Sequence, residues 1–357
     1  MVSAIIGLAA ALLMATADAG TSPDALTLKP EQRLLFLDDY AVEESTGLAR
    51  TMHSPEKRGA VIKPDTPSDG PLIQTRGEPV WSPEDQEYKL IYYAYGNLPS
   101  GTGMAIATSK DGLTWTKPRL GIVEVKGSKE NNWIDIDPKI VAPNRAIDGI
   151  VYDAGDPDPS RRYKAMMGAI NRQPAVSPDA IHWTLGGSAE VSSSDESHFL
   201  YDQDSHRFYA IVKTSNQYGR AFAISESSDF EYWTPNRALF GADEIDQKMA
   251  PEIIRRRIAD PDKPGLTFIE PEPGTGSPPP QDGPRQPVWR AEVYNIAVFP
   301  YEGVYIGLPS MYYPTGTCLP ERNNTDGFHE IQLAMSRDLE HWTRLGERRP
   351  FIAPSGI

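Results

Sequence analysis

The sequence of 357 residues lacks several features that define common protein classes. Its one cysteine, Cys318, cannot form an internal disulfide, and we interpret it as a small packed side chain. There is no zinc-type histidine cluster, phosphate loop, dinucleotide fingerprint or Gly-x-Ser-x-Gly elbow. Beyond the N-terminus, no apolar run is long enough to cross a bilayer. These absences argue against a disulfide-rich domain, a zinc site and a nucleotide-binding enzyme.

Basic residues are also in short supply. Lys and Arg number 35 against 49 Asp and Glu, which gives a net charge of −14. A chain with this charge is a poor partner for nucleic acid or an anionic membrane. Its 33 prolines, 29 glycines, 16 tyrosines and 7 tryptophans suit many short strands joined by tight turns. The composition therefore favours a globular, all-β protein.

Residues 1–19 have the pattern of a signal peptide. The segment Ile5–Met14 forms an apolar core, and Ala17-Asp18-Ala19 gives a small-x-small cleavage pattern. No Lys or Arg precedes the core, so a membrane anchor is the alternative, although the apolar run is short for a span. We expect export to a secreted or periplasmic location, and one domain over residues 20–357.

The pattern Ser-x-Asp-x-x-x-Trp-Thr is repeated along the chain. Its four copies are Ser109–Thr116, Ser177–Thr184, Ser227–Thr234 and Ser336–Thr343. Alternating apolar residues precede it, which is typical of a strand. The Ser and Asp side chains can bond local backbone groups in a turn, and the Trp can fill space between sheets. Each copy therefore predicts a hairpin near the outer edge of one propeller blade.

A second pattern precedes each hairpin: a short strand, a turn, and a strand rich in Tyr and aliphatic residues. The four cases are Pro79–Trp81 with Tyr88–Tyr93, Ile150–Tyr152 with Tyr163–Met167, Phe199–Tyr201 with Phe208–Val212, and Val293–Val298 with Val304–Leu308. Two strands and a hairpin make a four-stranded antiparallel blade. The sequence therefore predicts an all-β fold, a β-propeller.

Four motifs account for four blades, but two further segments suggest a fifth. Arg349–Ile357 resembles the approach to another blade, and Arg33–Leu37 is a strand-like stretch that could close a ring. We predict five blades with the last one incomplete in this chain; a four-bladed ring is the alternative. The Pro/Gly-rich residues 260–288 predict an exposed flexible insertion. Arg255–Arg257 just before it is interpreted as a solvated patch, with a ligand site as the alternative.

An acidic residue stands at the start of each predicted innermost strand. These acids are Glu78, Asp148, Glu196 and Glu292, and Asp39 can supply a fifth. Innermost strands of a propeller converge on a channel whose mouth binds ligands. Paired carboxylates can protonate a glycosidic oxygen and activate water or attack the anomeric carbon. The alternative is that these acids bond strand-start amides or hold a structural cation in the channel; no cofactor is expected.

We predict that Glu78, Asp148, Glu196 and Asp39 are catalytic and that Glu292 binds substrate. Further substrate-binding candidates are Arg50, His53, Arg76, His198, Trp133 and Tyr294. Arg76 and His198 flank predicted acids, and Trp133 lies in a loop where an indole could stack on a sugar. For an isolated His or Arg, a structural role is the alternative. The expected partner is an oligo- or polysaccharide.

The Ser-x-Asp-(Gly/Leu)-x-x-Trp hairpins resemble those of the five-bladed propeller glycoside hydrolases. These are the invertase-like (family 32) and arabinanase-like (family 43) enzymes and the related mannoside phosphorylases. Asp111-Gly112 and Asp338-Leu339 match their usual forms. Leu35–Asp39 followed by Arg50-Thr-Met-His53 is similar to uncharacterised bacterial secreted invertase-like members. The resemblance covers roughly residues 33–350.

This resemblance implies a catalytic carboxylate in the first blade, an auxiliary Asp in the second and a Glu acid in the third. By position these fall on Glu78 (or Asp39), Asp148 and Glu196. The chain has no Trp-x-Asn-Asp-Pro-Asn-Gly, Arg-Asp-Pro or Glu-Cys-Pro motif at these places, which argues against a true invertase.

Two alternatives to a glycoside hydrolase stay open from the sequence. One is a glycan-binding propeller without catalysis, because the family motifs are missing. The other is a polysaccharide lyase, which needs a Tyr or His base and a group that neutralises the acid. Tyr294, His198 and Arg76 would serve those roles.

Overall fold

The computed structural model describes residues 30–95, 102–140, 146–168, 170–261, 289–317 and 325–354. The predicted signal peptide, Cys318 and most of the predicted insertion lie outside the described residues. The chain divides into two units, Met1–Leu48 and Ala49–Ile357. The described residues of the first unit form turns and bends without a strand, so the strand expected at Arg33–Leu37 is wrong.

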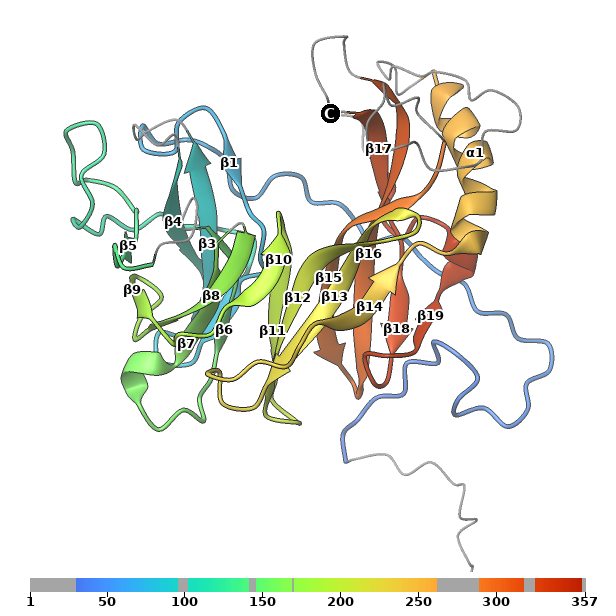
Figure 1. The fold of residues 1–357 in the computed structure, drawn as a ribbon, viewed down its shortest axis with the longest axis horizontal. Helices are drawn as coiled ribbons and strands as arrows, with labels where there is room; N and C mark the ends of the chain where they lie inside the picture. Colours follow the sequence, from blue (N-terminus) through green and yellow to red (C-terminus); the bar gives the residue numbers. More distant parts are fainter. Residues whose placement is uncertain are drawn as a thin grey trace, which may run out of the picture. The chain divides into compact units, whose positions relative to one another are not determined.

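The second unit contains four successive, mainly antiparallel sheets (Figure 1). The first comprises β1 (Ile73–Gln74), β2 (Val80–Ser82), β3 (Glu87–Tyr95) and β4 (Thr102–Ser109). The second comprises β5 (Asp135–Ile136), β6 (Ile147–Tyr152), β7 (Tyr163–Met167), β8 (Ile170–Ser177), β9 (His182–Leu185) and β10 (Val191–Ser194). The 3-10 helix η2 (Pro159–Arg161) precedes β7.

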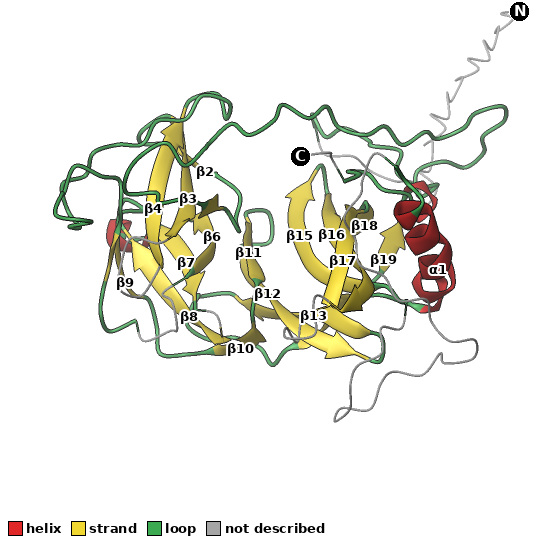
Figure 2. Ribbon diagram, turned by 90° about the horizontal axis from the view of Figure 1, so that it is seen from above, coloured by secondary structure: helices red, strands yellow, loops and turns green. Residues whose placement is uncertain are grey.

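The third sheet is a simple meander of β11 (Ser197–Asp202), β12 (Arg207–Asn216), β13 (Gly219–Ser227) and β14 (Arg237–Gly241). The fourth comprises β15 (Glu292–Tyr301), β16 (Val304–Thr317), β17 (Thr325–Ile331), β18 (Ala334–Ser336) and β19 (Trp342–Arg344), followed by η3 (Gly346–Arg348). The helix α1 (Glu244–Ile258) connects the third sheet toward the fourth and packs beside β16 (Figure 2). No helix in the described part of the chain is both long and apolar enough to span a bilayer.

The innermost strands are neighbours in chain order. Strand β6 contacts β2 on one side and β11 on the other, and β11 also contacts β15. Clusters of buried apolar residues fill the space between successive sheets. Because each sheet buries its faces against the next, the arrangement is propeller-like. The all-β prediction and the strand pairs of the second repeated pattern are confirmed.

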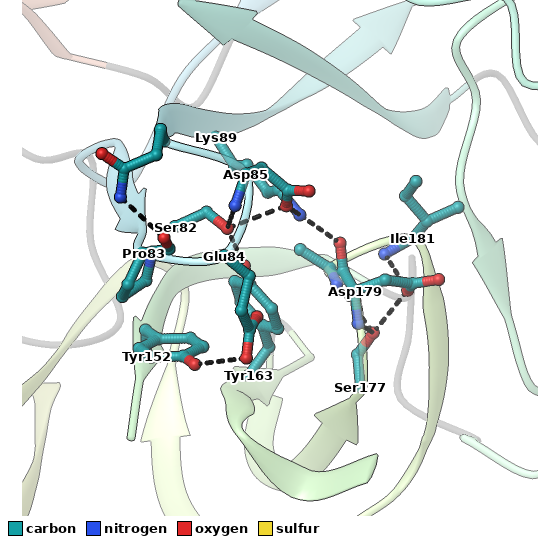
Figure 3. Close-up of polar contacts among 12 residues, drawn as sticks. Ser82, Pro83, Glu84, Asp85, Lys89, Tyr152, Tyr163, Ser177, Asp179 and Ile181 are labelled. Atoms are coloured by element: carbon teal, nitrogen blue, oxygen red, sulfur yellow. Dashed lines mark hydrogen bonds and ion pairs between the residues drawn. The ribbon is translucent and has the colours of Figure 1, made fainter. Parts of the chain in front are cut away.

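Polar contacts also join the first two sheets (Figure 3). The Tyr163 hydroxyl donates to Ser82 Oγ at 2.8 Å, and Lys89 Nζ donates to the Asp179 carbonyl at 3.0 Å. The Tyr152 hydroxyl donates to Glu84 Oε1 at 2.8 Å. Since all three contacts cross from one sheet to the other, they fix how these sheets sit against each other.

All four repeated motifs form the same turn. In each, the Ser hydroxyl donates to the Asp carboxylate at 3.0–3.1 Å, and that carboxylate accepts two backbone N–H groups two and three residues later. The residue after Asp has a positive φ in every copy: Gly112, Ala180, Phe230 and Leu339. The predicted hairpin turn is confirmed, and its Asp is a structural acceptor.

The prediction of five blades is wrong for the described residues, which form four. The segment expected to begin a fifth blade instead returns to the fourth sheet, where the Phe351 N–H donates to the Ile331 carbonyl at 2.8 Å. Ile352 also forms an isolated β-bridge to Ile331. The chain therefore adds an edge to β17 at this point.

Arg255–Arg257 lies in the last turn of α1, a helix that the sequence pattern did not predict. The Arg255 guanidinium lies 5.5 Å from the centre of the Trp289 ring, and Arg257 lies 5.8 Å from that of Phe328. Arg255 and Arg256 are exposed, in keeping with a solvated patch, and two of the three arginines also pack on aromatic rings.

Candidate functional site

The structure brings the predicted acids to corresponding places on the inner strands. Glu78 lies two residues before β2, Asp148 is the second residue of β6, Glu196 directly precedes β11, and Glu292 opens β15. Their surroundings differ: the Glu78 side chain is 46% exposed, whereas that of Asp148 is 1% exposed. The carboxylates therefore lie in different environments.

The first inner strand is interrupted between β1 and β2, and this break supplies two site residues. Residues 75–79 make no ladder with β3, which frees Arg76 and Glu78 to reach other sheets. Gly77 holds the break against β6, because a Cβ there would lie 2.7 Å from the Gly149 Cα. Glycine is therefore needed for this close approach of two backbones.

Arg76 connects two of the acids. Its Nη1 lies 3.7 Å from Asp148 Oδ1, and its Nη2 lies 3.9 Å from Glu196 Oε1. Its guanidinium also covers the Tyr93 ring, 5.0 Å from the centre. Burial alone would lower the pKa of Arg76, but Tyr93, Asp148 and Glu196 outweigh it and raise the pKa. Arg76 is thus a permanent cation between the second and third inner strands.

Asp148 is saturated by partners. It accepts hydrogen bonds from the Tyr93 hydroxyl at 2.8 Å and from the Ser197 N–H at 3.0 Å. The fully buried Arg172 places its Nη1 3.2 Å from Asp148 Oδ2. Burial, then the Asp148 charge, raise the pKa of Tyr93, so the phenol stays protonated and donates. With its oxygens engaged, Asp148 positions Arg76 and the start of β11.

Glu196 lies beside two cations, Lys213 and Arg76. Lys213 Nζ donates to Glu196 Oε2 in a short contact and lies 3.2 Å from Asp195 Oδ2. The same Nζ is 4.2 Å from the centre of the Tyr294 ring. Burial would raise the pKa of Asp195, but the contact with Glu196 and the charge of Lys213 lower it. Lys213 and Arg76 thus both favour the ionised form of Asp195.

Glu78 is the most exposed of the four acids, and its partner is a histidine. Glu78 Oε2 lies 3.6 Å from His198 Nδ1. His198 Nε2 lies 2.8 Å from the Val298 carbonyl, so the proton on Nε2 donates there and Nδ1 faces the carboxyl. This arrangement leaves Glu78 accessible while fixing the imidazole beside it.

Glu292 is buried between two arginines. The Arg220 N–H and Nη1 donate to its Oε2 at 3.1 and 2.8 Å, and Arg290 Nε donates to its Oε1 at 2.7 Å. Burial would raise the pKa of Glu292, but Arg290 and Arg220 outweigh it and lower the pKa. Gly219, with φ of 118°, leaves the room that the Glu292 side chain fills. Glu292 therefore orients the arginines.

Several predicted residues lie elsewhere. Asp39 belongs to the first unit and is not placed relative to this site. Arg50 and His53 are exposed on the segment that leads into the first sheet. Trp133 is 2% exposed, packs where a Cβ on Gly103 would clash with it, and donates its indole N–H to the Ser68 carbonyl. The prediction that Trp133 stacks on a sugar is therefore wrong, because it belongs to the core of the first blade.

The cations of the site were not predicted from the sequence. They are Arg172, Lys213, Arg220 and Arg290. The first three meet acids 17 to 72 residues away in the chain, whereas Arg290 lies two residues before Glu292 and could have been found from that spacing. No group of three or more His, Cys, Asp or Glu side chains in the described ranges could hold a metal ion. A cavity of about 500 Å³ lies apart from the acids, between β14, α1 and β19, with Phe240, Trp342 and Arg348 in its wall.

No family model and no curated protein matches the chain. Among the similar solved structures is an α-L-arabinanase of Penicillium chrysogenum, at 12% identity and a TM-score of 0.39 over 84% of this chain and 72% of that one. Another is a GH62 α-L-arabinofuranosidase catalytic domain of Coprinopsis cinerea, at 12% identity and 0.42 over 84% and 74%. A third is an N-acetylgalactosamine deacetylase from F. plautii, at 12% identity and 0.39 over 80% and 70%. The neighbours include arabinanase-like enzymes, the group that the sequence resembles, but similarity at this level carries no activity over to this chain.

Proposed function

We propose that this protein is a carbohydrate-active enzyme that hydrolyses glycosidic bonds with Glu78 and Glu196. One observation carries the proposal: two side chains from the break between β1 and β2 lie beside residues at the start of β11. Arg76 from the break lies 3.9 Å from Glu196, and Glu78 lies 3.6 Å from His198, two residues beyond Glu196. These two contacts support a site shared by an exposed carboxyl and a carboxylate paired with cations, the kind of pair that glycosidic cleavage uses.

The surroundings assign the two roles. Glu196 contacts Lys213 and lies 3.9 Å from Arg76, and a carboxylate paired with cations suits the group that activates water or attacks the anomeric carbon. Glu78 is 46% exposed and has no Lys or Arg ion pair among the described residues, which suits the acid that protonates the leaving oxygen. These roles are the reverse of those that the family resemblance implies for the first and third blades. Asp148 positions Arg76 beside Glu196.

Two carboxamide variants test this proposal on a panel of polysaccharides and aryl glycosides. We expect Glu78→Gln and Glu196→Gln each to lower kcat/KM by about 10²–10⁴-fold on polysaccharides, the usual contribution of a general acid or base. On aryl glycosides with a good leaving group, Glu78→Gln should retain far more activity, because that departure needs no proton. Glu226→Gln, on β13 away from the site, is the control. Unchanged activity in both variants would overturn the assignment.

The two alternatives give different results in the same assays. A lyase would release an unsaturated sugar, detected by its ultraviolet absorbance. Tyr294 is a poor candidate for the base of a lyase, because burial and the charges of Glu196 and Asp195 raise the pKa of its phenol. A glycan-binding propeller would bind a polysaccharide without turnover. It is favoured by one observation, that Asp148 and Glu292 both accept backbone N–H groups.

We also propose that the chain is exported, on the basis of residues 1–19. Expression with its own N-terminus in a bacterial host should place the protein outside the cytoplasm. N-terminal sequencing should then read from Gly20, and retention of the full N-terminus in the cytoplasm would contradict export.

A further inference from the structure

The start of the fourth inner strand carries more positive than negative charge. Two guanidiniums, Arg220 and Arg290, share the single carboxylate of Glu292. The Glu292 side chain is 2% exposed, whereas that of Arg220 is 43% exposed. One buried carboxylate balances only one of the two guanidiniums, so one positive charge remains at the surface. The buried Glu292 fixes the arginines that carry this charge.

Arg220 is also oriented, which an ordinary surface arginine is not. Its guanidinium carbon lies 5.2 Å from the centre of the Tyr294 ring and 5.5 Å from that of Tyr312. Only its Nη1 and backbone N–H have hydrogen-bond acceptors among the described residues, and both donate to Glu292. Its Nε and Nη2 are therefore left for a ligand, on a side chain whose conformation is already fixed.

This group adjoins the proposed catalytic carboxylate. Tyr294 links the two groups, because its ring contacts Arg220 and also Lys213, the cation bound to Glu196. Lys213 is itself balanced by Asp195 and Glu196. The excess charge thus stays with Arg220 and Arg290, one aromatic ring away from the acid that acts on the sugar.

We propose that Arg220, Arg290, Tyr294 and Tyr312 form a subsite for the carboxylate of an acidic sugar, and that the substrate is a uronic-acid-containing glycan. A planar carboxylate matches the two free donors of a guanidinium, which can bind both of its oxygens. A neutral sugar would leave these donors without a charged acceptor. The inference rests on the proposed function only for the claim that the glycan is cleaved.

Binding is measured by titration calorimetry with a trimer of galacturonic acid and with the same trimer after reduction of its carboxyls. The Glu78→Gln protein is used, because this change slows turnover and leaves the charges around Lys213 and Glu196 in place. We expect the acidic trimer to bind about tenfold or more tightly than the neutral one, as a charge-assisted hydrogen bond predicts. Arg220→Gln in this background should remove the preference. Arg207→Gln, an exposed arginine of β12 outside the subsite, should keep it.

Equal affinity for the two trimers, or a preference that survives Arg220→Gln, would overturn the inference. Competition by inorganic sulfate as strong as that by galacturonate would also overturn it, because it would show a site for any small anion. Acid preference without turnover in the unmodified protein would sustain the subsite and refute the hydrolase. Turnover of neutral glycans without a preference for the acidic trimer would sustain the hydrolase and refute the subsite.

Discussion

Gly219 occupies a position where any side chain would displace a site residue. Its φ is 118°, and an added Cβ would lie 2.6 Å from Cδ of Glu292. We expect Gly219→Ala to lower the free energy of unfolding by about 1–3 kcal/mol, from backbone strain and from the displaced carboxylate. Urea denaturation measures this loss.

Gly121→Ala is the matched control for that substitution. Gly121 also has a positive φ, of 73°, but nothing lies within 4 Å of an added Cβ. Gly121→Ala should therefore lower the free energy of unfolding only by the contribution of backbone strain. If both variants lost the same stability, the contact between Gly219 and Glu292 would have no energetic weight, and the packing argument for the orientation of Arg220 would fail.

At the scale of the element, the repeated turn depends on ionised aspartates. The N–H groups of Thr114 and Leu113 lower the pKa of Asp111 from 3.8 to about 2. Because the pKa is lower in the folded state, the ionised carboxylate stabilises the fold above pH 3.8, and this contribution is lost as the pH falls through about 2. The same direction holds for Asp179, Asp229 and Asp338.

The Asp111→Asn variant should therefore lose less stability in acid than the unmodified protein. Thermal unfolding would be followed from neutral pH down to pH 2 in both proteins, and the difference in Tm between them should narrow as the pH falls. Glu124→Gln, an exposed acid outside the four turns, serves as the control. A constant difference across the acid range would show that the Asp111 charge does not support its turn.

The helix α1 shows where an element could not be predicted from local pattern. It contains Pro251 and few apolar residues, which resembles a linker. Its N-terminus is capped by Asp243, and its buried Asp246 pairs with Arg344 of β19, 98 residues later, at 2.5 Å. A helix fixed by tertiary charge pairs gives little periodic signal in its own sequence.

At the scale of the whole molecule, the repeated motif predicted the blades and the register of the four acids. It could not predict their cations, because Arg220 meets Glu292 72 residues later through the hairpin tip of another sheet. The loop position of Trp133 suggested an accessible indole, but this side chain is buried against the first sheet. The prediction of a fifth blade was wrong, because the backbone at Phe351 bonds to Ile331 of the fourth sheet. Sequence repeats thus reveal the scaffold, whereas the chemistry depends on contacts between repeats.

The contact between the first and second sheets sets the position of two site residues at once. An added Cβ on Gly77 would lie 2.7 Å from the Gly149 Cα, so Gly77→Ala must push residues 75–79 away from β6. Arg76 and Glu78 would move with that segment. Since a misplacement of about 1 Å can cost 10²-fold in rate, we expect kcat/KM to fall by about that factor while the protein stays folded.

Gly149→Ala separates this effect from a general loss of packing. An added Cβ at Gly149 would meet Phe199 at 3.5 Å, which is ordinary van der Waals contact, so that variant should keep its activity. Steady-state kinetics on the best substrate of the panel, with circular dichroism to verify folding, compares the two. If Gly77→Ala were as active as Gly149→Ala, the break between β1 and β2 would not position the catalytic groups. The assignment of Glu78 and Glu196 to one catalytic site would then lose its structural support.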